Sequence, residues 1–266
     1  MSNTLADVTS EINLIAKAVM EKEGSSETMT FTEIKDRIAA IQTGGGSSVS
    51  STPPMSAPLV WVDVGSYVSG ANVWDNKGTL TDAVNVKGVS INDAGDALLI
   101  QTSGAVCCNF SETYNDFTMY SVIRCPYRFD ADADYPMLAA DGTADNYVKL
   151  AFVSNAATSI KMIIRSYTAE LGCYDYVKNY AILAMTCKAG TQYAYINGCP
   201  LLKQTRGENF GIRNLCHKCA YTANDPIAAV GKNNYYVKAT LAYNAAHTFD
   251  EVVAMSDWLK AKYLAK

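Results

Sequence analysis

Carboxylates and histidines are the side chains best suited to catalysis, and both are sparse in this sequence. A glycosidase needs two carboxylates about 5–10 Å apart, most simply supplied by an E-x-D-x-x-E run on one strand. No such run occurs. Any Ser/His/Asp or Cys/His site would have to use one of the only two histidines, His217 and His247. We therefore predict that the chain is not an enzyme and has no catalytic residues. The glutamates after residue 58 are Glu112, Glu170, Glu208 and Glu251.

One histidine lies in a pattern that resembles half of a zinc site. His217 belongs to Cys216-His217-Lys218-Cys219, whose cysteine spacing is that of a zinc knuckle. Zinc takes four ligands, and Cys107-Cys108 is too closely spaced to supply an ordinary second pair. Buried structural thiols are the favoured interpretation, with zinc as the alternative. His247 is expected to be a surface polar residue at the start of the last helix.

Alternate aspartates suggest a cation site. Asp130, Asp132 and Asp134 could direct oxygens at Ca²⁺, with Asp141 and Asp145 close by. The segment lacks the glycine and the distal glutamate of an EF-hand, so a solvated loop between two strands is the favoured interpretation. No other cofactor is predicted.

Sugar binding calls for exposed aromatic rings beside hydrogen-bonding side chains, because sugars stack on rings and bond to Asn, Asp and Arg. The second half of the chain contains a set of tyrosines, asparagines and an aspartate at predicted loops. Packing at the ends of a β-sandwich or between subunits is an equally open explanation. The candidate glycan-binding residues are Tyr174, Tyr176, Tyr221, Asn224, Asp225, Asn233, Asn234, Tyr235 and Tyr236.

Composition excludes several classes of function. The 266 residues contain 17 tyrosines and 7 phenylalanines, which suits sheet surfaces, and carry a net charge of −4 without a basic stripe. Nucleic-acid binding is therefore disfavoured. No apolar run approaches the ~20 residues of a transmembrane helix. The N-terminus does not resemble a secretory signal, so folding in a cytoplasm with eight reduced cysteines is expected.

The first 42 residues predict two short amphipathic helices. Apolar residues recur at intervals of three and four, and Thr30 and Glu33 form a capping box before the second helix. Such short helices need a partner, so self-association or docking is expected, and Val and Ile at both core positions are compatible with a trimer. Residues 43–58 are a Gly/Ser/Pro linker. The anchoring seam is predicted to contain Leu5, Val8, Ile12, Ile15, Val19, Phe31, Ile34, Ile38 and Ile41.

Residues 59–266 predict short alternating strands followed by a helix over Thr248–Leu264. A central hairpin turns at Lys188-Ala189-Gly190 and again at Asn197-Gly198. Around ten strands favour a two-sheet antiparallel sandwich. The expected strands are Leu59–Val64, Ala97–Thr102, Phe117–Cys125, Tyr135–Ala140, Tyr147–Val153, Ile160–Tyr167, the hairpin within Tyr180–Thr205, Ile227–Gly231 and Val237–Tyr243.

The Tyr195-Ile196-Asn197-Gly198 step, followed by a short apolar strand, resembles laminin-G-like and concanavalin-A-like lectin and glucanase domains. The end of the chain adds to this likeness, with Ala229-Val230-Gly231 before the last strand and an acidic helix start at Asp250-Glu251. The resemblance covers residues 59–266 and implies a mainly β fold, an antiparallel two-sheet jelly-roll sandwich. The helical hairpin (1–42) and the flexible linker (43–58) predicted above precede it.

Residues 12–25 resemble helical hairpins in structural proteins of tailed phages, which precede a linker and a variable β domain. This resemblance implies a non-enzymatic protein displayed on the virion surface and assembled in the host bacterial cytoplasm. Its expected partners are virion proteins of the capsid or tail, copies of itself in a trimer, and a cell-surface glycan, without nucleic acid or a membrane span. A capsid fibre or decoration protein is favoured. A tail fibre receptor-binding protein is the alternative, and a polysaccharide-degrading enzyme is the third hypothesis.

Overall fold

The computed structural model describes residues 50–125, 134–140, 147–153, 159–164, 167–171, 179–205, 211–217, 219–222, 225–229 and 234–265. The predicted helices within 1–42, with their seam from Leu5 to Ile41, and the first part of the linker lie outside the described residues.

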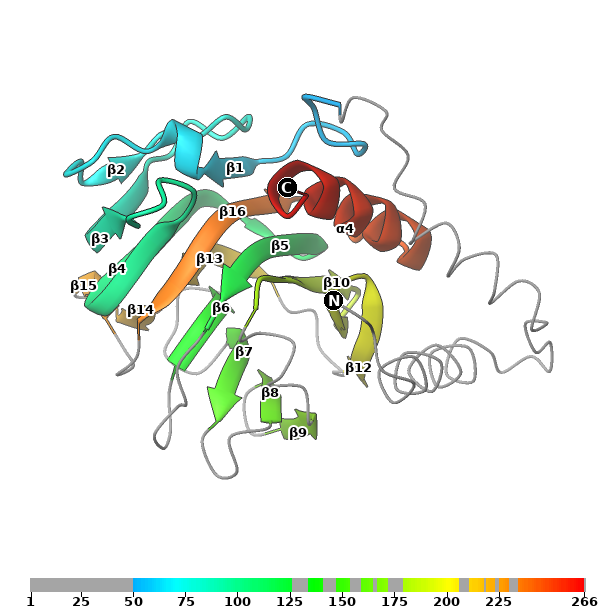
Figure 1. Cartoon of the computed structure of the whole chain (residues 1–266). Coiled ribbons are helices and arrows are strands. Elements are labelled where there is room, and N and C mark those ends of the chain that lie inside the picture. The colour runs from blue at the N-terminus through cyan, green and yellow to red at the C-terminus, as the bar shows by residue number, and fades with distance from the viewer. Residues whose placement is uncertain are drawn as a thin grey trace.

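The described part of the chain is mainly β, with a single α-helix near its C-terminus (Figure 1). The elements are, in order, β1 (Val60–Asp63), the 3₁₀-helix η1 (Val64–Ser66), β2 (Val73–Trp74), β3 (Val84–Ile91), β4 (Leu98–Tyr114), β5 (Phe117–Arg124), β6 (Asp134–Ala140), β7 (Tyr147–Val153), β8 (Ser159–Ile164), β9 (Tyr167–Leu171), β10 (Ala181–Lys188), β11 (Thr191–Ile196), β12 (Cys199–Thr205), β13 (Ile212–His217), β14 (Cys219–Thr222), β15 (Asp225–Ala229), β16 (Tyr235–Tyr243) and α4 (Phe249–Tyr263).

The strands form two antiparallel layers that share a seam. The helix-side layer has the order β12-β11-β10-β5-β16-β1, and the second layer has the order β2-β3-β4-β13-β6-β7-β8-β9. The layers join where the start of β16 pairs with the start of β4, at Val237 and Leu98. Strands β14 and β15 form a separate pair. The predicted antiparallel two-layer sandwich is confirmed.

Strand β5 shows why both faces of the helix-side layer are apolar. Phe117, Met119 and Ile123 contribute to the core between the two layers. Tyr120 and Val122, at the alternate positions, contribute to a second core that includes α4. Because side chains alternate across a strand, a strand buried on both faces reads as one continuous apolar run.

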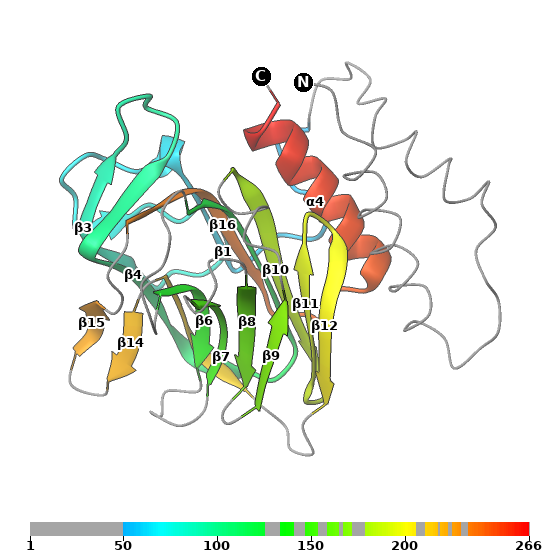
Figure 2. The ribbon, with the colours of Figure 1, turned by 60° about the horizontal axis from the view of Figure 1, so that its bottom comes forward.

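Helix α4 covers the outer face of the helix-side layer, where β10, β5 and β16 lie (Figure 2). Thr248 accepts a hydrogen bond from the backbone N–H of Glu251, whose side chain accepts from the Thr248 N–H in a capping box. Val252, Met255 and Leu259 are fully buried against the sheet. Full burial of an apolar side chain of this size contributes about 1.5–3 kcal/mol.

The central hairpin has the two turns that the sequence predicted. Ala189 and Gly190 have φ values of 46° and 76°, and Asn197 and Gly198 have values of 51° and 81°. Two successive positive φ angles are typical of the type I′ turns that match the twist of a hairpin. The Asn197 side chain also accepts a hydrogen bond from the backbone N–H of Ile182, which ties the second turn to β10.

The prediction of around ten strands was too low, because the described residues alone contain sixteen. Strands β3 and β4 continue through Gly88 and Gly104, and neither glycine lies in an expected strand. A Cβ on Gly104 would lie 2.4 Å from the carbonyl oxygen of Gly88, and the β3–β4 register shifts between Lys87 and Val89. The two glycines therefore allow close approach of two bent strands.

Candidate functional site

Arg124 lies between two tyrosines on the outer face of the helix-side layer. It ends β5, and Tyr236 on β16 is its direct cross-strand partner. On the other side Ala181 of β10 pairs with Ile123, so Tyr180 precedes β10 beside Arg124. The Arg124 guanidinium carbon lies 4.6 Å from the Tyr236 ring centroid and 5.4 Å from that of Tyr180. Adjacent strands thus align one cation with two rings.

A second cation lies beside this row. Lys238 is two residues after Tyr236, and its Nζ lies 4.4 Å from the Tyr180 ring centroid. The Lys238 Nζ pairs with Asp96 Oδ2 at 2.8 Å and donates to the backbone carbonyl of Tyr263 at 3.2 Å. Lys238 is only 7% exposed. We refer to Arg124, Tyr180, Tyr236, Lys238 and Asp96 as the arginine–tyrosine cluster.

Asp96 is itself held in place by the turn between β3 and β4. Its Oδ1 accepts from Asn92 Nδ2 at 2.8 Å, and its backbone N–H donates to Asn92 Oδ1 at 3.0 Å. The turn passes through Gly95 with φ at 71°. The β3–β4 turn therefore fixes the carboxylate that neutralises Lys238.

The cluster can donate hydrogen bonds from both a cation and a phenol. Burial, assisted by the charge of Asp96, raises the pKa of Tyr180 to about 12, although Arg124 opposes the shift. The Tyr180 hydroxyl is therefore protonated at neutral pH and able to donate. Arg124, Tyr180 and Tyr236 are all partly exposed. A partly exposed guanidinium flanked by aromatic rings suits a polar ligand with a flat ring face.

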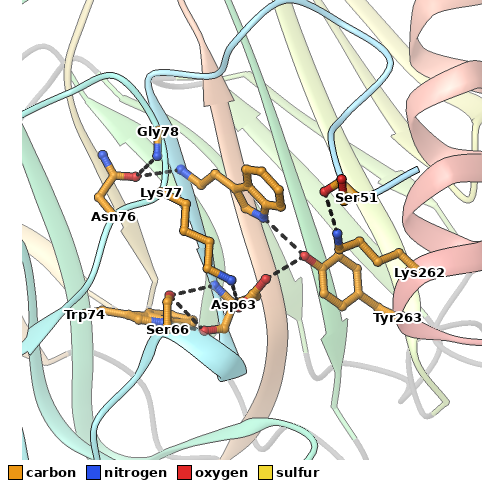
Figure 3. A network of polar contacts seen from close by, with 10 residues as sticks. Ser51, Asp63, Ser66, Trp74, Asn76, Lys77, Gly78, Lys262 and Tyr263 are labelled. Atoms are coloured by element: carbon orange, nitrogen blue, oxygen red, sulfur yellow. Dashed lines mark hydrogen bonds and ion pairs between the residues drawn. The ribbon is translucent and has the colours of Figure 1, made fainter. Parts of the chain in front are cut away.

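A polar network at the C-terminal end of α4 adjoins the cluster (Figure 3). Asp63, at the end of β1, is 5% exposed and accepts from Lys77 Nζ at 2.7 Å and from the Tyr263 hydroxyl at 2.9 Å. The Tyr263 hydroxyl accepts from Trp61 Nε1 at 3.1 Å. The backbone carbonyl of Asp63 accepts from Trp74 Nε1 at 2.8 Å. This network fixes the end of α4, whose carbonyl holds Lys238.

The same end of α4 also binds the segment that leads into β1. Lys262 Nζ donates to the carbonyl of Ser51 at 2.8 Å (Figure 3). Trp258 Nε1 donates to the carbonyl of Ser50 at 2.9 Å. Lys262 also lies 4.9 Å from the Trp258 ring centroid and 5.1 Å from that of Trp61. We call these contacts the linker clasp, because Ser50 and Ser51 belong to the predicted linker.

The structure divides the predicted glycan-binding residues. Tyr174, Tyr176, Asn224 and Asn233 lie outside the described residues. Tyr221 and Asp225 belong to strands β14 and β15 and not to loops. Tyr235 is fully buried, with its ring in the core between the layers, so the prediction that it contacts a glycan is wrong. Tyr236 belongs to the arginine–tyrosine cluster, and Asn234 is at the same end of β16.

Arg124, Tyr180, Lys238 and Asp96 were not among the predicted site residues. The first three are at strand ends or within strand patterns and read as ordinary parts of the sheet. An arginine that ends an otherwise apolar strand, opposite a tyrosine in the partner strand, was the available signal.

The predicted metal sites find little support in the described structure. Asp130 and Asp132 lie outside it, and Asp134 is the first residue of β6. Within the described ranges, no three His, Cys, Asp or Glu side chains converge as metal ligands do. His217 is buried, with Nε2 at 2.7 Å from Thr240 Oγ1. Cys108 and Cys187 are buried free thiols.

The expectation for His247 is wrong, because this residue is buried at the junction of β16 and α4 and not on the surface. It is 9% exposed, and Nδ1 lies 2.8 Å from the Tyr120 hydroxyl. Its backbone N–H donates to Thr118 Oγ1. Desolvation lowers the pKa of His247, partly opposed by the charge of Glu251.

Comparison with known proteins identifies the fold. No family model matches the chain, and no curated relative matches. A Trypanosoma rangeli sialidase with a bound difluoro sugar acid shares 13% identity and a TM-score of 0.60, over 97% of this chain and 40% of the sialidase. The binding domain of botulinum neurotoxin serotype D shares 11% identity and a TM-score of 0.55, over 76% of this chain and 51% of that structure. The chain thus spans about half or less of each.

At this level of identity the neighbours show that the chain shares their β-sandwich fold. They also correct the prediction that the chain is not an enzyme. The fold occurs in a sialidase as well as in neurotoxin binding domains. The sandwich therefore gives no positive evidence against catalysis.

No helix in the described part of the chain is long and apolar enough to cross a membrane.

Proposed function

We propose that this protein binds glycans through the arginine–tyrosine cluster of its β-sandwich. The observation that carries the proposal is the row formed by Tyr180 just before β10, Arg124 on β5 and Tyr236 on β16, with all three side chains partly exposed. Aromatic rings offer a stacking face to a sugar, and the guanidinium and the Tyr180 hydroxyl donate to its oxygens.

The comparisons support a sugar ligand. The serotype D neurotoxin ligand-binding domain is known in complex with N-acetylneuraminic acid, and the Trypanosoma rangeli sialidase in complex with sialic acid. Both share the fold of this chain at 10% and 13% identity, and therefore show the architecture alone.

We further propose that the protein is part of a tailed-phage virion, with the β-sandwich outermost and residues 1–42 as the anchor. The likeness of residues 12–25 to phage helical hairpins supports this role, as does the Gly/Ser/Pro composition of residues 43–58. A capsid fibre or decoration protein is the favoured placement. A tail fibre that binds a receptor is the second placement.

A glycan microarray probed with the full-length protein tests the binding role. Tyr236→Ala should abolish the signal, because it removes one stacking ring without touching the core. Tyr193→Ala is the matched control, since Tyr193 is a partly exposed tyrosine on β11 that also has a lysine over its ring, at 5.6 Å. Equal loss in both variants, or no glycan bound by the native protein, would contradict the proposal. Released sugar in the incubation would show turnover in addition to binding.

The virion role is tested separately by deleting residues 1–42. The truncated chain should not enter phage particles, and imaging a C-terminal tag on intact particles should place it on the head. Normal incorporation of the truncated chain would overturn the anchoring role, and a label at the tail would favour the tail fibre.

A further inference from the structure

We infer that the sugar recognised at the arginine–tyrosine cluster is acidic, and that Arg124 binds its carboxylate. This inference rests on the proposed glycan-binding function and adds the chemical class of the ligand.

The charge balance of the cluster singles out Arg124. Of its two cations, Lys238 is neutralised by Asp96 at 2.8 Å. Among the described residues, Arg124 pairs with no carboxylate, and its Nε is buried without a hydrogen-bond acceptor. A buried donor that lacks an acceptor is unfavourable, because it loses its hydrogen bonds to water without a replacement. Within the described residues, the cluster therefore contains one positive charge more than its single carboxylate neutralises, and this surplus favours an anionic ligand.

The surroundings of Arg124 also hold its guanidinium in place. Tyr236 and Tyr180 flank it at 4.6 and 5.4 Å, on strands directly paired with or adjoining β5. A guanidinium already held between rings loses little side-chain entropy when it binds. Its planar donors match the two oxygens of a carboxylate, which favours a sugar carboxylate over a neutral hydroxyl.

Lys238 adds positive charge beside Arg124, but it is too buried to contact a bound sugar directly. Its Nζ is 2.8 Å from Asp96 Oδ2 and 3.2 Å from the Tyr263 carbonyl, and the side chain is 9% exposed. The tyrosine rings provide the faces on which the apolar side of a pyranose ring stacks. The structure therefore assigns the carboxylate to Arg124 and the sugar ring to Tyr236 and Tyr180.

Calorimetric titration of the full-length protein with sialyllactose, lactose and sulfated lactose tests this assignment. Sialyllactose should bind at least 10-fold more tightly than lactose, and its affinity should fall as salt rises. Arg124→Gln should reduce sialyllactose affinity at least 10-fold and lactose affinity by a much smaller factor, because lactose has no carboxylate. Arg124→Lys keeps the charge but loses the planar donors, and should lie between. Arg213→Gln, at an exposed arginine on β13, is the matched control. Thermal unfolding of each variant checks the fold.

The outcomes separate the two proposals. Equal affinity for lactose and sialyllactose, or an unchanged Arg124→Gln variant, would overturn the acidic ligand while leaving glycan binding in place. Tighter binding of sulfated lactose than of sialyllactose would overturn the carboxylate. Binding of no sugar, alone or on an array, would overturn both proposals.

Discussion

Replacement of Asp63 by Asn tests how the end of α4 is held against the sandwich. The carboxylate accepts from Lys77 and from the Tyr263 hydroxyl, and it is 5% exposed. Burial raises the pKa of Tyr263, so its hydroxyl is protonated and donates. An asparagine keeps the shape but has only one acceptor oxygen. One of the two hydrogen bonds is therefore lost and the charge is removed.

The expected cost follows from these contacts. A hydrogen bond to a charged group contributes about 1.5–3 kcal/mol. Lys77 is 39% exposed and can turn towards water, which reduces the loss. We expect Asp63→Asn to lower the free energy of unfolding by about 1.5 kcal/mol, equivalent to a fall of about 3–6 °C in Tm for a body of this size.

Urea unfolding followed by tryptophan fluorescence measures this change. Asp75→Asn is the matched control, because Asp75 is exposed and should stay within about 0.5 kcal/mol of the native protein. If Asp63→Asn also stays within that range, the network does not stabilise the end of α4, and the reasoning fails.

Three further predictions concern other parts of the sandwich. Because the pKa of His247 is lowered, the unfolded chain takes up this proton first, so stability should fall as pH drops below about 6.5. Thermal unfolding from pH 7.5 to 5.5 should show a smaller fall in His247→Gln, and identical profiles would refute this. Ala189→Asn should raise the unfolding free energy by about 0.5–1 kcal/mol, since Asn tolerates the φ of 46° better than Ala; a loss measured in urea would contradict it. Trp258→Phe removes the donor to Ser50, so limited proteolysis should cut near Ser50 several-fold faster, whereas unchanged cleavage would argue against the linker clasp.

The fold was largely predictable because its strands carry local signals. The apolar stretch in β10 and the type I′ pairs Ala189-Gly190 and Asn197-Gly198 are short-range features that a sequence displays directly. Strands β3 and β4 were missed or shortened because Gly88 and Gly104 serve a close contact between strands. That contact exists only once the sheet has formed.

The candidate site was much less predictable because it depends on register. Tyr236 was identified by its type, yet its neighbour Tyr235 has the same chemistry and faces the core. Arg124 is a candidate site residue only because strand pairing places it opposite Tyr236 and beside Tyr180. These tyrosines are 112 and 56 positions away in sequence. Strands that pair across such separations leave no recognisable pattern in the sequence around either residue. For the same reason His247 read as a surface residue, although Tyr120 binds it in the interior.

The most direct test of the account is a crystal structure of the protein grown with sialyllactose. We expect the sugar carboxylate within about 3 Å of the Arg124 guanidinium nitrogens, with the pyranose ring against Tyr236 or Tyr180. An ordered sugar bound elsewhere on the molecule, with the arginine–tyrosine cluster untouched, would contradict the account.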